Sequence, residues 1–178
     1  MAHPNQLDAI QQQLIQINNR LNGIDNRLDG IDNQVATINA RAALGEARKI
    51  NSQNMTVLLE AMRYYPERRT ELSNAVDYKR IPKLIPGHPN VELPHIQNMN
   101  MQAAYEIGDL PPPNLLPRND AAYTALKSTH QNLSILRTTV RSIQWFYHDP
   151  KLGPMLNENA TRDDCCNFLY TLEEYIKL

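Results

Sequence analysis

Histidine and cysteine are the residues of this 178-residue sequence that could ligate a metal ion or act as a nucleophile. There are seven of them: His3, His88, His95, His130, His148, Cys165 and Cys166. A helical metal site needs two histidines one turn apart with carboxylates beside them, and no pair here has that spacing. A nucleophilic cysteine needs a histidine close to it, and nothing in the sequence fixes such a contact for Cys166. Burial is the expected state of Cys165.

The motifs of common catalytic and cofactor sites are also missing from the sequence. It contains no GxGxxG, no GxxxxGK[ST] and no GxSxG, so neither a phosphate-binding loop nor a nucleophile elbow is indicated. We therefore expect a protein that is not an enzyme, with no catalytic residues, no cofactor and no metal.

A basic and aromatic segment offers a different chemistry, contact with nucleic acid. Residues 46–83 carry eight Lys or Arg against five acids, although the net charge of the chain is only −1. Basic side chains interleaved with aromatic ones, here Tyr64 and Tyr65, are typical of a protein surface that binds nucleic acid. The alternative is a solvated basic face that meets acidic parts of the same assembly. The candidate contacts within segment 48–83 are Arg63, Arg68, Arg69, Lys79 and Arg80.

The N-terminal third carries the strongest pattern in the chain, a heptad repeat. Its apolar residues alternate steps of three and four without an error, which is typical of a coiled coil. We call these ten residues the heptad seam: Leu7, Ile10, Leu14, Ile17, Leu21, Ile24, Leu28, Ile31, Val35 and Ile38. Leu and Val occupy the a positions and Ile the d positions, a combination that favours three or four strands over two. The sequence leaves trimer and tetramer open.

The heptad seam coexists with residues that disfavour a helix. Asn22 and Asp29 fall at b positions, and Gly23 and Gly30 at c positions, so all four should face solvent. The isolated segment should then be a weak helix that forms only when the seam is buried by partner chains. We expect folding of residues 5–42 and oligomerisation to be coupled.

Charges beside the seam indicate the strand direction. Arg20 and Arg27 lie at g positions, while Asp25 and Asp32 lie at e positions. In a parallel assembly Arg20 faces Asp25 of the next chain and Arg27 faces Asp32, whereas an antiparallel pairing places like charges together. The sequence predicts a parallel oligomerisation stalk at residues 5–42. One helix of an intramolecular bundle is the alternative.

Two further segments follow the predicted stalk. Residues 43–80 should form short amphipathic helices interrupted at Pro66. Residues 81–118 form a proline-rich extended arm or linker, since eight of the twelve prolines lie between positions 82 and 117. Its apolar content is high for a solvated tether, which favours an arm laid over the C-terminal helices.

The remaining residues, 119–178, should form a C-terminal module in which two helices pair as an antiparallel hairpin. Asn119 or Asp120 is expected to cap a first long amphipathic helix reaching Tyr147, and Thr161 to cap a second. The expected buried stripe of the second helix is Cys165, Phe168, Leu169, Leu172, Tyr175 and Ile176. Basic Lys127, Arg137 and Arg141 on the first helix are placed to face Glu173 and Glu174 on the second.

The expected compartment is intracellular, cytoplasmic or nuclear. The N-terminus lacks a charged and apolar leader, and no stretch approaches the roughly 20 apolar residues that span a bilayer. The two adjacent cysteines are poorly placed to form a disulfide with each other. We expect no membrane partner.

Residues 7–55 also resemble a known group of proteins. The run LNGIDNRLDGIDNQVATINARAA, followed by KINSQN and a proline-bearing segment, is similar to uncharacterised fungal coiled-coil proteins related to a meiotically up-regulated fission-yeast family. The resemblance implies a coiled coil and no activity.

Together these patterns predict an all-α homo-oligomer, a parallel trimer or tetramer whose stalk displays several copies of the C-terminal module. The expected function is assembly or scaffolding, with the chain itself and another protein as partners. Two alternatives stay open: a nucleic-acid-associated oligomer that uses segment 48–83, and a self-assembling fibre or shell subunit.

Overall fold

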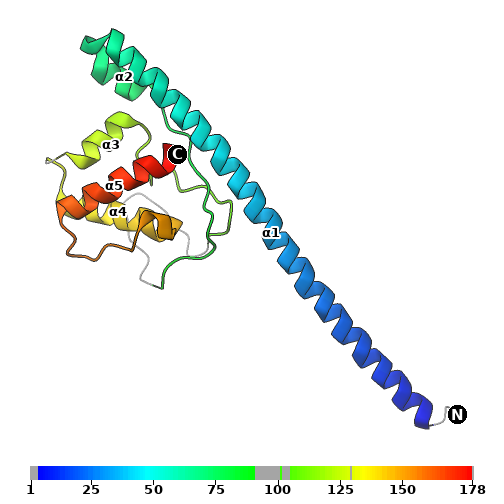
Figure 1. Ribbon diagram of the computed structural model, residues 1–178. Helices are drawn as coiled ribbons and strands as arrows, with labels where there is room; N and C mark the ends of the chain where they lie inside the picture. The colour runs from blue at the N-terminus through cyan, green and yellow to red at the C-terminus, as the bar shows by residue number, and fades with distance from the viewer. Residues whose placement is uncertain (1–3, 91–100, 102–104, 129, 178) are drawn as a thin grey trace. The chain divides into compact units, whose positions relative to one another are not determined.

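The protein is all-helical, as Figure 1 shows for a computed structural model that describes residues 4–90, 101, 105–128 and 130–177. No strand occurs within these residues. The α-helices are α1 (Pro4–Tyr64), α2 (Arg69–Ala75), α3 (Asp120–Lys127), α4 (Leu133–Tyr147) and α5 (Arg162–Lys177). Two 3₁₀ turns, η1 (Pro66–Arg68) and η2 (Pro150–Leu152), follow α1 and α4.

Helix α1 continues for 61 residues, well beyond the predicted stalk. The boundary expected between residues 42 and 43 falls inside this helix, because a second set of residues is buried along it from Ala40 onward. The helix ends where Pro66 approaches. Tyr65 leaves the helical conformation, with φ −130° and ψ 64°, as expected for a residue that precedes proline.

The chain divides into two compact units, Met1–Ile38 and Asn39–Leu178. In the first unit none of the described side chains is buried. The second unit has a hydrophobic core to which the C-terminal half of α1, the proline-rich segment and helices α3, α4 and α5 all contribute. The C-terminal module is therefore larger than the predicted residues 119–178, because its core includes Leu44 and Ala47 of α1.

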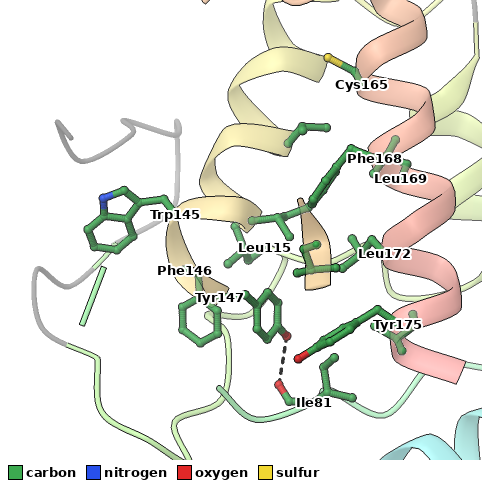
Figure 2. Packing of buried hydrophobic residues seen from close by; sticks show 14 of the residues in the cluster. Ile81, Leu115, Trp145, Phe146, Tyr147, Cys165, Phe168, Leu169, Leu172 and Tyr175 are labelled. Atoms are coloured by element: carbon green, nitrogen blue, oxygen red, sulfur yellow. Dashed lines mark hydrogen bonds between the residues drawn. The ribbon is translucent and has the colours of Figure 1, made fainter. Parts of the chain in front are cut away.

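Helices α4 and α5 pack against each other at the centre of this core. All six residues of the stripe predicted for the second helix are buried, which confirms the period read from the sequence. Figure 2 shows Tyr147 of α4 with Leu172 and Tyr175 of α5 pointing toward one another. The antiparallel hairpin predicted for this pair is wrong, because α4 and α5 run in the same direction. Arg137 near the start of α4 donates to the carbonyl oxygen of Ala160 just before α5, and Tyr147 at the end of α4 lies beside the ring of Tyr175 near the end of α5. Residues 148–161 return along α4 to the start of the pair.

The first helix of the predicted hairpin is in fact two helices. The prediction of a single helix reaching Tyr147 is wrong, because α3 ends at Lys127 and α4 begins at Leu133. Asn132 stabilises the break: its side chain accepts hydrogen bonds from the backbone N–H groups of Ser134 and Ile135, which gives α4 an N-cap. Thr129, which lies within the predicted single helix, is outside the described residues.

The helix starts follow from capping residues. Asn119 caps α3, since its side chain accepts from the N–H of Ala122. Before α5, the carboxylate of Asp164 accepts from both the N–H and the hydroxyl of Thr161, and the Thr161 Oγ1 accepts from the N–H of Asp164. This reciprocal arrangement is a capping box and holds the pKa of Asp164 below its ordinary value.

Over its described part, the proline-rich segment packs on helices α4 and α5 rather than extending into solvent. Ile81 and Leu115 are fully buried in the core. Tyr147 anchors the segment by donating its hydroxyl hydrogen to the carbonyl oxygen of Ile81 at 3.0 Å (Figure 2). Residues 91–100 lie outside the description, and with them His95.

Candidate functional site

The heptad seam is a long row of exposed apolar side chains on helix α1. All ten of its side chains are between 48% and 65% exposed, with Val35 and Ile24 at the lower limit and Ile38 at the upper. They recur along 32 residues of one continuous helix. A stripe this long is far more than the scattered apolar residues found on ordinary surfaces. Another helix placed along the seam would remove these side chains from water.

The charged residues predicted to flank the seam are available for contacts between chains. Arg20, Asp25, Arg27 and Asp32 form no ion pair or hydrogen bond within the described part of the chain. They lie at g and e positions of α1, where a parallel neighbour presents the opposite charge. Exposed pairs of this kind contribute little stability, so they set direction and register more than affinity.

The helix-averse glycines of the seam region lie in helical backbone, as expected. Gly23 and Gly30 both fall within α1, and a Cβ atom added at either would meet no atom within 4 Å. Neither glycine serves a turn or a close contact within this chain. Their cost is therefore conformational, about 1 kcal/mol each relative to alanine.

Beyond residue 38 helix α1 buries a different face from the seam. In the heptad frame of the seam, five of the six buried residues of this part fall at f and c positions, and Met62, near the end of the helix, falls at g. The five are Ala40, Leu44, Ala47, Asn51 and Leu58. These positions lie on the opposite side of the helix from a and d. The a and d positions of the same stretch stay exposed; they are Ala42, Gly45, Lys49, Ser52, Thr56, Leu59 and Arg63.

Two polar residues on this second face were missed by sequence reasoning. Asn51 is completely buried; its side-chain amide donates to the carbonyl oxygens of Lys79 and Ile176 and its Oδ1 accepts from the N–H of Lys79. Arg48 donates its Nε hydrogen to the carbonyl oxygen of Tyr175 at 2.7 Å. Arg48 and Asn51 thus donate hydrogen bonds to carbonyl groups at the C-terminal end of α5. The last carbonyl groups of a helix have no donor within the helix itself. The only sequence signal was the small residues Ala40 and Ala47, spaced seven apart.

The ion pairs predicted for the hairpin are present in part. Glu173 of α5 contacts Lys127 of α3 at 3.0 Å and Lys177 one turn along α5 at 2.6 Å. Burial raises the pKa of Glu173, but the hydrogen bonds from these two lysines outweigh burial and lower the pKa below its ordinary value. Arg137 instead donates to the carbonyl oxygen of Ala160, and Arg141 pairs with Glu158.

The predicted nucleic-acid contacts are divided between two locations. Arg63, Arg68 and Arg69 lie around the junction of α1, η1 and α2, where Arg68 forms a bidentate pair with Glu71. Lys79 and Arg80 follow α2 and are engaged elsewhere, Lys79 with Glu46 and Arg80 with the carbonyl oxygen of Pro111. The structure therefore brings three of the five residues together.

The histidines and cysteines considered for catalysis take part in the packing and backbone geometry of the fold. His88 stacks on Trp145 with ring centroids 4.5 Å apart, and His148 ends α4 in a left-handed conformation with φ 44°. Cys165 is buried, and that burial raises the pKa of its thiol, which disfavours the nucleophilic thiolate. Among the described residues no group of three or more His, Cys, Asp or Glu side chains is arranged to hold a metal ion. His3 lies outside the description.

Comparisons with models of protein families, with curated proteins and with solved structures find no match for this chain. The resemblance of residues 7–55 to fungal coiled-coil proteins stays a prediction. In the part of the chain that the structure describes, no helix combines the length and the apolar character that crossing a membrane requires.

Proposed function

We propose that this chain is the subunit of a parallel homo-oligomer, a trimer or tetramer, that holds several copies of the unit Asn39–Leu178 for binding another protein. The observation that carries the proposal is the exposure of all ten seam side chains in the single chain. Fully burying each would contribute roughly 1.5 to 3 kcal/mol, well above the local cost of the glycines in the same helix. No catalytic role is needed for this function.

The occupant of the seam is a further copy of the same chain. Strict alternation of three and four residues suits a helix with the same repeat, since knobs of one strand then meet holes of the next at every step. The charges agree with this choice, because Arg20 with Asp25 and Arg27 with Asp32 are complementary between identical parallel chains. A different helix would have to reproduce both patterns.

Assembly and folding of the C-terminal unit use different faces of α1. The unit Asn39–Leu178 buries the f and c positions Ala40, Leu44 and Ala47, whereas the seam uses a and d. Oligomerisation therefore does not compete with the core of the unit. Each chain can keep its folded unit while the assembly multiplies the number of binding surfaces, which raises avidity without new contacts.

The mass of the intact chain in solution tests the proposal. One chain is 20.4 kDa, and light scattering should give three or four times that value, independent of concentration in the micromolar range. A mass of 20.4 kDa would refute the oligomer. A mass that grows with concentration would favour the fibre or shell subunit, in which the C-terminal unit binds copies of itself.

Crosslinking tests the parallel direction. With Cys165→Ser and Cys166→Ser as background, Leu7→Cys should crosslink efficiently through a short bismaleimide, because identical a positions meet in a parallel assembly. Ala9→Cys is the matched control at an outward c position and should crosslink poorly. Equal yields for both variants would contradict the parallel register, since an antiparallel pairing places residue 7 far from its copy.

Nucleic-acid binding is the second candidate function. It rests on Tyr64 and Tyr65, which are 75% and 53% exposed beside Arg63 and Arg69. Exposed aromatic rings can stack on bases while the arginines contact phosphates. A single-stranded oligonucleotide should then bind with an affinity that falls steeply with salt and that Tyr64→Ala with Tyr65→Ala reduces. Binding unaffected by these substitutions would exclude this surface.

A further inference from the structure

The unit Asn39–Leu178 carries a groove with a concentration of positive charge. The groove has a volume of about 780 Å³ and lies among α1, residues 84 and 85, the η2 turn and the end of α5. Five of its lining side chains are cationic and one is a carboxylate; they are Arg41, Arg48, Lys49, Lys151, Lys177 and Asp149. Since the whole chain has a net charge of −1, this groove is not a sample of a generally basic surface.

Arg48 is held in one orientation at the wall of the groove. Its Nε–H donates to the carbonyl oxygen of Tyr175, and its guanidinium carbon lies 4.6 Å from the centroid of the Tyr175 ring. These contacts leave both terminal NH₂ groups without a hydrogen bond inside the described part of the chain. A fixed planar guanidinium with two available NH₂ groups is well suited to contact the oxygens of an anion.

The single carboxylate of the groove is already occupied by other donors. The Oδ2 of Asp149 accepts from the Tyr175 hydroxyl at 2.7 Å and its Oδ1 accepts from the backbone N–H of Lys151 at 2.9 Å. Asp149 is only 8% exposed. It offsets one positive charge of the groove but pairs with none of the lining cations.

Three of the cations also lack an anionic partner. The side chains of Arg41, Lys49 and Lys151 make no ion pair or hydrogen bond with any described residue, whereas Lys177 contacts Glu173. Their flexible side chains can adjust to a ligand while Arg48 stays in place. The arrangement combines one oriented guanidinium with several mobile point charges.

We propose that this groove binds a small polyphosphate, a chain of two or more phosphate groups that is either free or attached to an organic molecule such as a nucleotide. A ligand with a single carboxylate group would leave most of the positive charge of the groove uncompensated. A polyphosphate brings several negative charges into one small volume. The volume is within the usual range of small-ligand sites, about 300 to 1,000 Å³. The site lies within one folded unit, so it does not depend on the proposed oligomer.

Calorimetric titration of the full chain with three probes tests the ligand chemistry. Tripolyphosphate and ATP, both without added metal, should bind, and the tighter of the two identifies the free or the nucleotide source. An octapeptide of glutamate carries more negative charge than either phosphate probe but no phosphate, and it should still bind at least tenfold more weakly than the better phosphate probe, as expected if the geometry of Arg48 contributes. No binding of either phosphate probe, or equal binding of the peptide, would overturn the proposal.

Substitutions locate the binding in the groove. Lys151→Gln and Lys49→Gln each remove one exposed charge that no described residue uses, and each should weaken tripolyphosphate binding about tenfold. Arg118→Gln is the matched control, because it removes an exposed charge that pairs with Asp77 outside the groove. Equal losses in the control and the groove variants would show unspecific attraction and overturn the site.

Arg48→Lys tests the oriented guanidinium itself. This variant keeps the charge but loses the planar group, and it should weaken tripolyphosphate binding further than Lys49→Gln does. Circular dichroism checks that the variant folds, since Arg48 also supports the end of α5. If it does not fold, the two lysine variants decide the proposal without it.

Discussion

The N-terminal part of α1 and helix α5 have the same kind of apolar stripe and opposite surroundings. The six stripe residues of α5 are at most 6% exposed, whereas the ten seam residues are at least 48% exposed. For α5 the cover comes from the same chain: α4, α3 and the proline-rich segment enclose it. Within the described part of the unit Met1–Ile38, nothing buries the seam. An apolar stripe indicates that one face of a helix has to be buried. Whether the same chain or another chain buries it depends on the rest of the sequence.

The largest effect should come from removing the internal cover of α5. Residues 119–178 alone lack Ile81, Leu44 and Ala47, which belong to the core. The fragment should expose apolar surface and aggregate or melt without cooperativity. A fragment of residues 39–178 keeps these residues and should melt cooperatively as a monomer, which thermal unfolding and light scattering can measure.

The two fragments differ only in residues 39–118, so each is the control of the other. If 119–178 forms a well-behaved cooperative monomer, the proline-rich segment is a tether and not part of the core. If 39–178 forms the same oligomer as the whole chain, the seam is not the source of assembly.

The next effect concerns the external cover of the seam. Ile24→Asn with Ile31→Asn places two amides per chain at buried d positions of the proposed oligomer. Loss of apolar burial and poor pairing of the amides should cost several kcal/mol per chain and dissociate the assembly, with a cost of about 1 to 3 kcal/mol expected for each unsatisfied polar group. Light scattering of the variant should give the mass of one chain.

Ile15→Asn is the matched control for this variant. Ile15 lies on the same helix at a b position and is 56% exposed, so it resembles the seam residues in chemistry and exposure but not in register. The control should keep the mass of the parent. An unchanged mass in the double variant, or an equal loss in the control, would argue against the seam.

Sequence reasoning was strongest where the period of apolar residues decides the structure. The all-helical class and the buried stripe of α5 followed from steps of three and four, and the cap at Asn119 followed from residue type. The extension of α1 to Tyr64 could not be predicted from this period. The apolar residues of the seam end before Ala42 and Gly45, and the helix then buries a second face that contains small residues. Small residues carry little hydrophobic signal, although they allow close packing.

Polar features were the least predictable from the sequence. Arg48, Asn51 and Lys83 read as ordinary surface residues of a basic segment, yet Asn51 and Lys83 are completely buried. Their positions depend on contacts between parts of the chain 28 to 127 residues apart, such as Arg48 with Tyr175. No local pattern encodes such a separation.

Lys83 offers a smaller test of the buried unit. Burial lowers the pKa of Lys83 to about 8 from its ordinary 10.5, although Asp109 and Asp149 act in the opposite direction, and its ammonium donates to the carbonyl oxygen of Phe146. Between these pH values the unfolded chain keeps a proton that the folded chain releases. The contribution of Lys83 to the free energy of unfolding should therefore rise as pH increases from about 8 toward 10.

Comparison with Lys83→Met isolates this contribution from other titrating groups. Above pH 10 the buried Tyr123 and Tyr147, whose pKa values burial raises, lower the stability of both proteins alike. Denaturant unfolding below that pH should show a stability difference between parent and variant that changes with pH in favour of the parent. A difference that does not change with pH would mean that burial does not lower the pKa of Lys83 in the folded protein.

The smallest effect on stability should come from replacing glycines. The glycines of the seam region are helical, whereas Gly87 of the second unit has a positive φ. Gly23→Ala with Gly30→Ala should raise the melting temperature, because both sites are helical and open, and each exchange contributes up to about 1 kcal/mol without changing subunit number. Gly87→Ala is the matched control: its surroundings are equally open, but its φ of +71° should cost roughly 1 to 2 kcal/mol for a side chain. Melting is compared at one protein concentration, since assembly makes it concentration-dependent. Destabilisation by the first pair would show that Gly23 and Gly30 make close contacts between chains, so that the outer face of the stalk would itself belong to the interface.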